Sequence, residues 1–298
     1  MNVFITGAAG FIGGTIANRL LAAGHRVSGL VRNTEKADAL AALGIAPIAG
    51  TLDDHDLLVR EARAADAVIN AANSDHRLAV EAMIEGLAGS GKPFLHTSGS
   101  SIVGDEAAGE PTDAVYDEDH LPVPRPDKAA RVAIDDHIRA AAGQGVRSAV
   151  LCNTLIYGHG RGLSRDSVQL PTLLARARRT GVMRHVGRGL NIWSNVHIDD
   201  VADAYLLALE KAAPGAFYFI ENGEASYRDM TAAIARVLNL GDPQPWPIDE
   251  AIAELGVGKA VYSLGSNSRV RGLRARPLLG WTPRQPAVLD WIANGMLG

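Results

Sequence analysis

The stretch Thr6-Gly7-Ala8-Ala9-Gly10-Phe11-Ile12-Gly13 decides the fold of this 298-residue chain. It directly follows the apolar run Asn2–Ile5 and leads into an apolar helical pattern. Between a strand and a helix, a first glycine permits a tight turn, a second lets the backbone approach a pyrophosphate, and a third allows close packing of helix on strand. The N-terminus of the helix then presents free N–H groups to phosphate charge. The sequence therefore predicts a dinucleotide-binding turn formed by Gly7, Ala9, Gly10, Phe11, Ile12 and Gly13.

The first half of the chain alternates short apolar runs with helical patterns. Its apolar runs are continuous rather than alternating, which is typical of a parallel sheet covered by helices on both faces. We predict an α/β fold, a Rossmann doubly wound parallel sheet. The predicted strands are Asn2–Thr6, Arg26–Arg32, Ala46–Ala49, Ala67–Asn70, Pro93–Thr97 and Arg147–Leu151, and the predicted helices cover 12–23, 35–43, 54–64, 76–90 and 127–142.

The second half loses this rhythm, which predicts a smaller C-terminal substrate lobe. The dinucleotide-binding domain is predicted to span 1–155, with part of 196–220 returning to it, and the lobe to comprise 156–195 and 221–298. Ser226 is predicted to cap a helix, because Asp229 stands where a capping box places an acceptor. Other predicted elements are the helices Val168–Arg179, Val201–Lys211 and Pro286–Met296 and the strand Phe217–Ile220.

Composition excludes several classes of protein. A formal net charge of −4 gives no long-range field that would attract nucleic acid. The single cysteine, Cys152, cannot form a disulfide within the chain, and its apolar neighbours predict a small buried side chain. No apolar stretch approaches the roughly 20 residues of a membrane helix, and the N-terminal run reads as a strand rather than a signal peptide. We therefore expect a cytoplasmic protein that binds neither nucleic acid nor membrane. No histidine pair has metal-ligand spacing, so no metal is predicted.

Several segments together resemble the extended short-chain dehydrogenase/reductase superfamily, a group of NAD(P)-dependent epimerases, dehydratases and reductases. The resemblance covers nearly the whole chain and is specific for the superfamily but not for a substrate. It includes the spacing Gly-x-x-Gly-x-x-Gly of the turn. The segments are Thr6–Gly13, Asn70-Ala71-Ala72, Thr97–Gly104, Ile156-Tyr157-Gly158, Val196–Ala202 and Leu279-Gly280-Trp281-Thr282-Pro283.

The end of the second strand distinguishes NADP from NAD. An acidic residue there would bind a free ribose 2′-hydroxyl, whereas a cation would pair with a 2′-phosphate. This chain has Arg32 there and no acid, and a guanidinium pairs bidentately with phosphate. We predict NADP, with NAD as the less favoured alternative. The resemblance also implies that Leu52 and Asp53 flank the adenine, that Asn70, Ala71 and Ala72 pass beside ribose and pyrophosphate, and that Thr97 contacts the cofactor.

The resemblance implies a Ser or Thr after the fifth strand and a Tyr-x-x-x-Lys on the next helix. There the tyrosine moves a proton, the lysine holds the ribose, and the serine polarises a carbonyl. Ser98 and Ser100 bracket the serine position, which falls on Gly99; hydroxyls that only complete a strand-to-loop turn are the alternative. The tyrosine position falls on Asp127 or Pro124, according to whether Arg131 or Lys128 stands for the lysine. Either cation could hold the ribose, but neither choice supplies a phenol.

A non-standard proton donor is therefore expected. Tyr157 is one candidate, although packing or a substrate contact is the favoured interpretation. Tyr116 and His159 are further candidates, whereas His96 and His197 are interpreted as structural.

The lobe carries seven arginines between positions 161 and 188. They predict either a solvated basic face or contacts to an anionic substrate. Trp193 stands where relatives often have a nucleotide-binding arginine, which argues against a nucleotide sugar and predicts the floor of a pocket for a smaller or more apolar ligand. The arginines are Arg161, Arg165, Arg176, Arg178, Arg179, Arg184 and Arg188.

Two functions stay open on the sequence alone. The first is an NADP-dependent oxidoreductase or epimerase acting on a small molecule with a carbonyl or hydroxyl group. The alternative is a non-catalytic NADP(H)-binding redox sensor or scaffold, which the missing Tyr-x-x-x-Lys would permit. Analogy with relatives that pair through two helices of the sheet adds the prediction of a homodimer.

Overall fold

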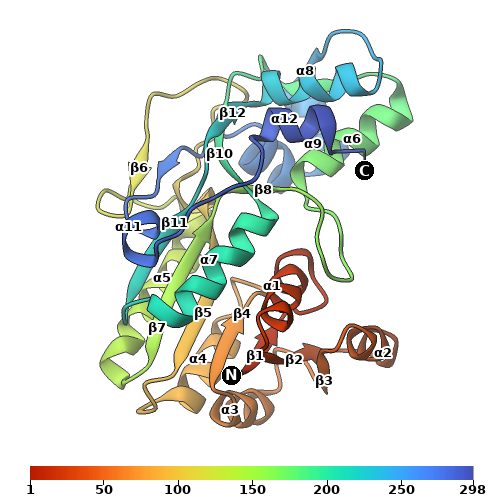
Figure 1. Cartoon of the computed structure of the whole chain (residues 1–298). Coiled ribbons are helices and arrows are strands. Elements are labelled where there is room, and N and C mark those ends of the chain that lie inside the picture. The colour runs from red at the N-terminus through yellow and green to blue at the C-terminus, as the bar shows by residue number, and fades with distance from the viewer. Residues whose placement is uncertain (298) are drawn as a thin grey trace.

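A computed structural model describes residues 1–297 and contains a seven-stranded central sheet (Figure 1). The strands lie in the order β11-β7-β5-β4-β1-β2-β3, and every neighbouring pair is parallel. This confirms the predicted α/β class. The strands are β1 (Asn2–Thr6), β2 (Arg26–Val31), β3 (Ala46–Ala49), β4 (Ala67–Asn70), β5 (Pro93–Gly99), β7 (Arg147–Asn153) and β11 (Ala216–Ile220).

Helices cover both faces of this sheet, as a doubly wound fold requires. One hydrophobic cluster joins one face to α1, α2 and α7, and a second joins the other face to α3, α4 and α5. The strands between them are buried on both sides, which explains their continuous apolar runs. The helices are α1 (Phe11–Ala22), α2 (Thr34–Ala42), α3 (His55–Ala64), α4 (Arg77–Leu87), α5 (Pro126–Ala140) and α7 (Ile198–Lys211).

Strands β5 and β7 extend beyond their predicted ends. Ser98 pairs with Cys152 and Gly99 with Asn153, so the parallel ladder continues through polar residues. The predicted strands ended at Thr97 and at Leu151. The ladder continues because Ser98 and Asn153 are buried and bonded within the protein.

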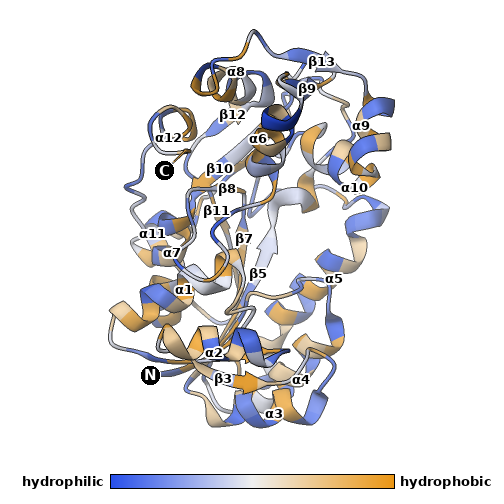
Figure 2. Ribbon diagram, turned by 90° about the vertical axis from the view of Figure 1, so that its right-hand side faces the viewer, coloured by the Kyte–Doolittle hydropathy of each residue, from blue (hydrophilic) through white to orange (hydrophobic). Residues whose placement is uncertain are grey.

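The remaining elements build a lobe above the ends of β5 and β7 (Figures 1 and 2). Its core is a third hydrophobic cluster around a three-stranded sheet in the order β12-β10-β8. Ser226 caps α8 by accepting a hydrogen bond from the backbone N–H of Asp229 at 3.1 Å, as predicted. The elements are β8 (Leu155–Tyr157), α6 (Gln169–Thr180), β9 (Arg184–Val186), β10 (Ile192–His197), β12 (Glu224–Ser226), α8 (Tyr227–Val237), β13 (Gln244–Trp246), α9 (Ile248–Leu255), α10 (Val257–Lys259) and α12 (Val288–Asn294).

Three short elements connect the lobe to the sheet domain, and one segment carried no prediction. Strand β6 (Tyr116–Asp117) pairs with β14 (Val270–Arg271), and α11 (Ala275–Leu279) packs in the same cluster as α7. The segment without a prediction, 248–264, forms α9, α10 and a π-helical turn, Ala260–Leu264. Within residues 1–297, no helix has the length and apolar character needed to cross a membrane.

Replacement of Gly13 by alanine tests the close packing of α1 on β1. A Cβ at Gly13 would lie 2.3 Å from the carbonyl oxygen of Gly7, a backbone atom that cannot rotate away. We expect Gly13→Ala to lower the free energy of unfolding by about 1–3 kcal/mol, measured by urea denaturation. The control is Gly143→Ala, where an added Cβ meets nothing within 4 Å. Equal losses in the two variants would contradict this account.

Candidate active site

The glycine turn brings the backbone of β1 and α1 against the chain that leaves β4. Gly7 has a φ of +79°, and a Cβ there would lie 2.5 Å from the carbonyl oxygen of Ala71. Gly10 caps α1 without a side chain, and the first turn of α1 contains no acidic residue. The N-terminus of this helix therefore suits an anion such as a pyrophosphate.

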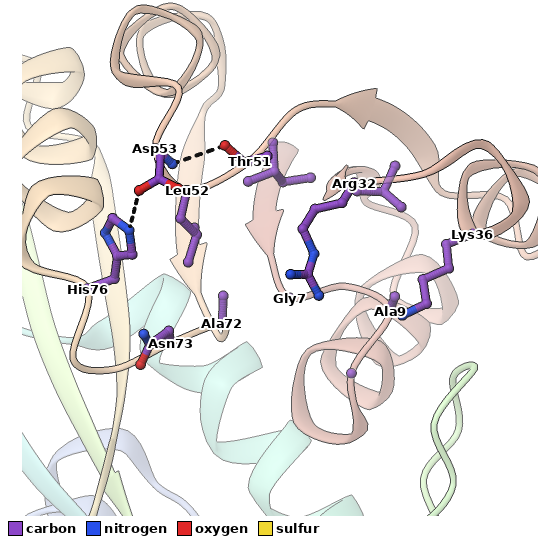
Figure 3. A pocket seen from close by; sticks show the side chains of 13 residues that line it. Gly7, Ala9, Arg32, Lys36, Thr51, Leu52, Asp53, Ala72, Asn73 and His76 are labelled. Carbon is purple, nitrogen blue, oxygen red and sulfur yellow. Dashed lines mark hydrogen bonds and ion pairs between the residues drawn. The ribbon is translucent and has the colours of Figure 1, made fainter.

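A cleft of about 560 Å³, the basic cleft, opens beside this turn (Figure 3). We call it basic because two cationic side chains reach into it, Arg32 from the end of β2 and Lys36 from α2. Lys36 was not predicted. The other lining residues are Gly7, Ala9, Gly10, Leu30, Val31, Thr51, Leu52, Asp53, Ala72, Asn73 and His76.

Hydrogen bonds order the wall of the basic cleft that carries Leu52 and Asp53. The backbone N–H of Thr51 donates to the carboxylate of Asp54 at 2.6 Å, and Asp53 is paired with His76 at 3.0 Å. Leu52 and Leu30 supply apolar surface in the same cleft. This combination suits an adenine ring flanked by apolar side chains.

Two more pockets, the central pocket and the polar pocket, lie in sequence after the basic cleft. The central pocket, of about 280 Å³, is lined by Phe11, Ile12 and Ala71, which are chain neighbours of residues in the basic cleft. The polar pocket, of about 400 Å³, shares Thr154, Val168 and Gln169 with the central pocket. The three spaces therefore follow one another along the carboxyl ends of the central strands, where open α/β sheets bind ligands.

Two glycines, Gly14 and Gly162, bring their backbones close together beside the central pocket. An added Cβ at Gly14 in α1 would lie 3.1 Å from the Cα of Gly162. The backbone N–H of Arg161 also donates to the hydroxyl of Thr15 at 3.0 Å. The glycine-rich loop 158–162 thus packs on α1, and the chain that follows it supplies Asp166–Gln169 to the pocket.

The polar pocket lies between the ends of β5 and β7, helix α5 and the lobe. Gly99 and Asn153 come from the strands, Lys128 and Arg131 from α5, and Trp193 from β10. Trp193 thus lines a pocket, as its sequence position suggested, and its indole N–H donates to the carbonyl oxygen of Ser266 at 2.7 Å. The remaining lining residues are Ser100, Ser101, Thr154, Val168, Gln169, Gly258, Tyr262 and Ser263.

The two predicted serines are not free in this pocket. Ser98 is buried and donates to the carboxylate of Asp135 at 2.7 Å. Ser100 lies at the wall of the pocket, but its hydroxyl is 2.7 Å from the hydroxyl of Ser268. Ser101 lines the pocket as well and was not among the predicted residues. Of the three serine hydroxyls, that of Ser101 has the longest contact, a hydrogen bond of 3.5 Å from the guanidinium of Arg131.

The two predicted cations differ in their partners. Arg131 donates to both carboxylate oxygens of Asp75, at 2.7 and 2.5 Å. Lys128 has its ammonium 3.4 Å from one oxygen of Asp127. Arg131 is therefore held by a bidentate pair, whereas Lys128 keeps donors for another partner.

Tyr157 lies away from the pockets. Its hydroxyl donates to the carbonyl oxygen of Pro286 at 2.7 Å, and its ring packs against His197 and Trp291. Burial raises the pKa of this phenol. The geometry favours the packing interpretation of Tyr157 over the role of proton donor.

Three residues predicted to contact the cofactor have close partners within the protein. Gly13 packs on the Gly7 carbonyl, and the hydroxyl of Thr97 accepts a hydrogen bond from Tyr205 at 2.8 Å. Asn70 is buried and belongs to the polar row described next. None of these three residues lines the basic cleft, the central pocket or the polar pocket.

A row of buried polar side chains crosses the sheet beneath the cleft. Thr6, Asn70 and His96 occupy one register row across β1, β4 and β5. Thr6 donates to the Asn70 side chain at 2.5 Å, and the amide nitrogen of Asn70 lies 3.1 Å from Nδ1 of His96. Nδ1 therefore accepts, which places the ring proton on Nε2. Nε2 lies 3.8 Å from Oδ1 of Asp135, and neither atom has a hydrogen-bond partner among the described residues.

Burial shifts the pKa values of both residues at the end of this row. It lowers the pKa of His96 to about 3, with a smaller contribution from Arg131. Burial raises the pKa of Asp135 to about 7, although the hydrogen bond from Ser98 acts in the opposite direction and lowers it. His96 is thus neutral near pH 7, while Asp135 changes its charge there.

Replacement of Asp135 by asparagine tests this shift. The folded pKa of about 7 lies above the ordinary 3.8, so wild-type stability is lost as the pH rises between these values. An amide does not ionise. We expect the stability of Asp135→Asn relative to wild type to rise by up to about 1.4 kcal/mol per pH unit in that window. Urea denaturation at about pH 5 and pH 7.5 measures it.

The control for this experiment is Asp38→Asn, because Asp38 is exposed and lies on a different helix, α2. Its stability relative to wild type should be the same at the two pH values. If the stability of Asp135→Asn relative to wild type is also independent of pH, the buried carboxyl does not titrate as described.

Most of the basic cluster in the lobe is used in ion pairs. Arg176 and Arg179 pair with Glu254, Arg184 with Glu250, and Arg188 with Glu110. Arg161 pairs with Asp199. None of the seven arginines lines the central or the polar pocket. The geometry therefore does not support the prediction that this cluster binds an anionic substrate. Across residues 1–297, no group of three His, Cys, Asp or Glu side chains is placed to hold a metal ion.

Comparison with known proteins agrees with this geometry. A family model described as the NAD dependent epimerase/dehydratase family matches residues 3–220, and the chain belongs to this family. It is an enzyme of a family that contains NAD(P)-dependent oxidoreductases and epimerases.

Relatives match over nearly the full length. The oxidase ucsJ of Acremonium sp is 32% identical and covers 96% of this chain and 94% of its own length. The 3-diazoavenalumate denitrifying reductase of Streptomyces sp is 27% identical and covers 99% and 100%. Among solved structures, the dTDP-glucose 4,6-dehydratase DesIV of Streptomyces venezuelae with NAD bound has a TM-score of 0.78 at 21% identity, and covers 100% of this chain and 96% of its own. The last comparison shows the fold.

Sequence reasoning missed three more residues of this region, besides Ser101. Lys36 follows Arg32 at a spacing of four, a signal that could have been read. Asp135 falls on the buried face of an amphipathic helix, where a carboxylate is unusual. Tyr262 lies in a segment for which no element was predicted, so the sequence offered no sign of its place.

Proposed function

We propose that this chain is an NADP-dependent oxidoreductase that reduces the carbonyl group of a small substrate in the polar pocket. The observation that carries the proposal is the row of three neighbouring pockets, which has Arg32 and Lys36 at one end and the polar pocket at the other. Its length and order suit a dinucleotide laid along the ends of parallel strands with a substrate beyond it.

The residues of the basic cleft fit NADP. Arg32 and Lys36 line it together, and no acid follows β2 in Val31-Arg32-Asn33. A 2′-phosphate placed there would meet a guanidinium and an ammonium, whereas the 2′-hydroxyl of NAD would lack a carboxylate acceptor. The close backbone contact at Gly7 leaves room for a pyrophosphate beside the N-terminus of α1.

The polar pocket fits a carbonyl substrate. The bound cofactor would supply a hydride from its nicotinamide ring. The hydroxyl of Ser101 and the ammonium of Lys128 can polarise the substrate oxygen and stabilise its developing negative charge. Helix α5 contains no tyrosine, so the proton must come from another group. The names of the relatives, an oxidase and a reductase, support redox chemistry.

A small carbonyl compound is the favoured substrate class over a nucleotide sugar. The arginines of the lobe are paired with carboxylates, and Trp193 closes one side of the pocket. An epimerase that binds a sugar diphosphate would need cations from the lobe directed into this space, in addition to Lys128 and Arg131 of α5.

Substitution of Arg32 tests the cofactor preference. We expect Arg32→Ala to weaken NADPH binding roughly 10- to 100-fold, because a charge-assisted contact to the 2′-phosphate is lost. NADH binding should change by less than about twofold. Quenching of protein fluorescence measures both dissociation constants. Arg63→Ala, an exposed arginine at the end of α3, is the control. Tighter binding of NADH than NADPH by the wild type would overturn the choice of NADP.

Hydride transfer itself is tested with the wild-type chain. We expect NADPH to be oxidised in the presence of ketones or aldehydes from a broad panel, followed by absorbance at the nicotinamide band. Slower oxidation with NADPH deuterated at C4 would identify the chemical step. Tight NADPH binding without turnover on carbonyl, sugar and nucleotide-sugar panels would instead favour a redox sensor, whose partner affinity would follow the NADP/NADPH ratio.

A further inference from the structure

We propose that Tyr262, from the lobe, donates the proton to the substrate oxygen in place of the missing motif tyrosine. This assignment rests on the proposed carbonyl reduction. It identifies a catalytic residue far from α5 in sequence.

The tyrosines of the described chain differ in whether their hydroxyls face the polar pocket or are enclosed elsewhere. Within the described chain, Tyr262 is the tyrosine that lines the polar pocket. Tyr157 donates to Pro286 and Tyr205 to Thr97, so both hydroxyls are bonded inside the protein. Tyr218 and Tyr227 are buried, and Tyr116 lines a separate pocket on the other side of Arg125.

Arg125 packs on the ring of Tyr262. The guanidinium of Arg125 lies over this ring, 4.5 Å from the centroid. Arg125 also donates to the backbone oxygens of Gly104 and Asp105, each at 2.7 Å, just after the segment that carries Ser100 and Ser101. One arginine thus connects the lobe tyrosine to the wall of the polar pocket.

In one of the two alignments of α5, the position of the motif tyrosine falls on Asp127. The carboxylate of Asp127 accepts two hydrogen bonds from Arg125, both at 3.0 Å. The residue at the motif position therefore fixes the guanidinium that packs on Tyr262. Where the family motif has a phenol on the helix, this chain has Asp127, which is linked through Arg125 to a phenol on the lobe.

The local backbone and the charge nearby suit this role. Tyr262 lies in the π-helical turn Ala260–Leu264, and single π turns are frequent at functional sites. Lys128 lines the same pocket and can stabilise negative charge on the substrate oxygen or on the phenolate. The other histidines and tyrosines considered from the sequence do not line this space.

The proposed reaction adds one hydride and one proton to the carbonyl group of the substrate. The carbonyl carbon gains a hydride from NADPH, and the carbonyl π bond breaks as its oxygen takes the proton of Tyr262. The products are an alcohol, oxidised NADP and a phenolate on Tyr262. Water then returns a proton to Tyr262, which is half-buried at the pocket wall.

The test compares Tyr262→Phe with Tyr116→Phe, which removes a phenol outside the polar pocket. With the best carbonyl substrate of the wild type, we expect Tyr262→Phe to lower kcat at least about 100-fold, the usual contribution of a general acid. Its NADPH dissociation constant and its Tm should match the wild type, and Tyr116→Phe should keep its kcat. Full activity of Tyr262→Phe would overturn the proposal. The proposal would also fail if Tyr262→Phe kept the wild-type kcat while Lys128→Met lost activity, because the ammonium of Lys128 would then be the proton donor.

A second measurement does not depend on turnover. Tetranitromethane nitrates accessible phenols, and peptide mass spectrometry reports each tyrosine. We expect 2,2,2-trifluoroethanol with NADP to protect Tyr262 but not Tyr116 in the wild-type chain. Equal nitration of Tyr262 with and without these ligands would overturn the proposal. If the wild type reduces no carbonyl, the proposed function fails by itself, and the nitration result then decides whether the Tyr262 phenol faces the bound oxygen.

Discussion

The close approach of two backbone segments, at Gly7 and at Ala71, is the constraint on which the rest of the site depends. A side chain at Gly7 would collide with the Ala71 carbonyl oxygen, and one at Gly13 with the Gly7 carbonyl oxygen. Without side chains there, β1, α1 and the end of β4 converge on one turn. That convergence leaves the start of α1 open to an anion and places Phe11, Ile12 and Ala71 on the walls of the next pocket. The cleft is therefore a consequence of backbone packing, and the side chains that line it add selectivity.

Charge is distributed in two ways across the molecule. On the lobe, most arginines of the basic cluster meet glutamates from distant segments and act as connections between elements. Along the cleft, Arg32 and Lys36 stand at one end and Lys128 at the other. The composition reports only the sum of these charges. Which of them face a ligand depends on how far each lies from a carboxylate after folding.

Much of the sheet domain could be predicted because its signals are local. Continuous apolar runs mark β1, β4 and β5, and their burial on both faces explains why no alternation was needed. The ends of β5 and β7 were missed because Ser98 and Asn153 look like loop residues until their partners Asp135 and Tyr205 are known. The same reason applies to Tyr157. Its position beside a glycine fits a substrate contact, but only the fold brings the Pro286 carbonyl to its hydroxyl.

The sequence by itself determined the parallel sheet, the glycine turn and the cation after β2, because each depends on residues that are neighbours in the chain. Only the tertiary structure decided which groups meet at the polar pocket. Asp127 and Arg125 are close in sequence, yet Tyr262 meets Arg125 only through the packing of the lobe on the sheet domain. The buried pair His96 and Asp135 was also decided by folding, since their altered pKa values arise from the removal of water around both. Contacts between distant segments and the loss of solvent are properties of the packed chain, and no local pattern encodes them.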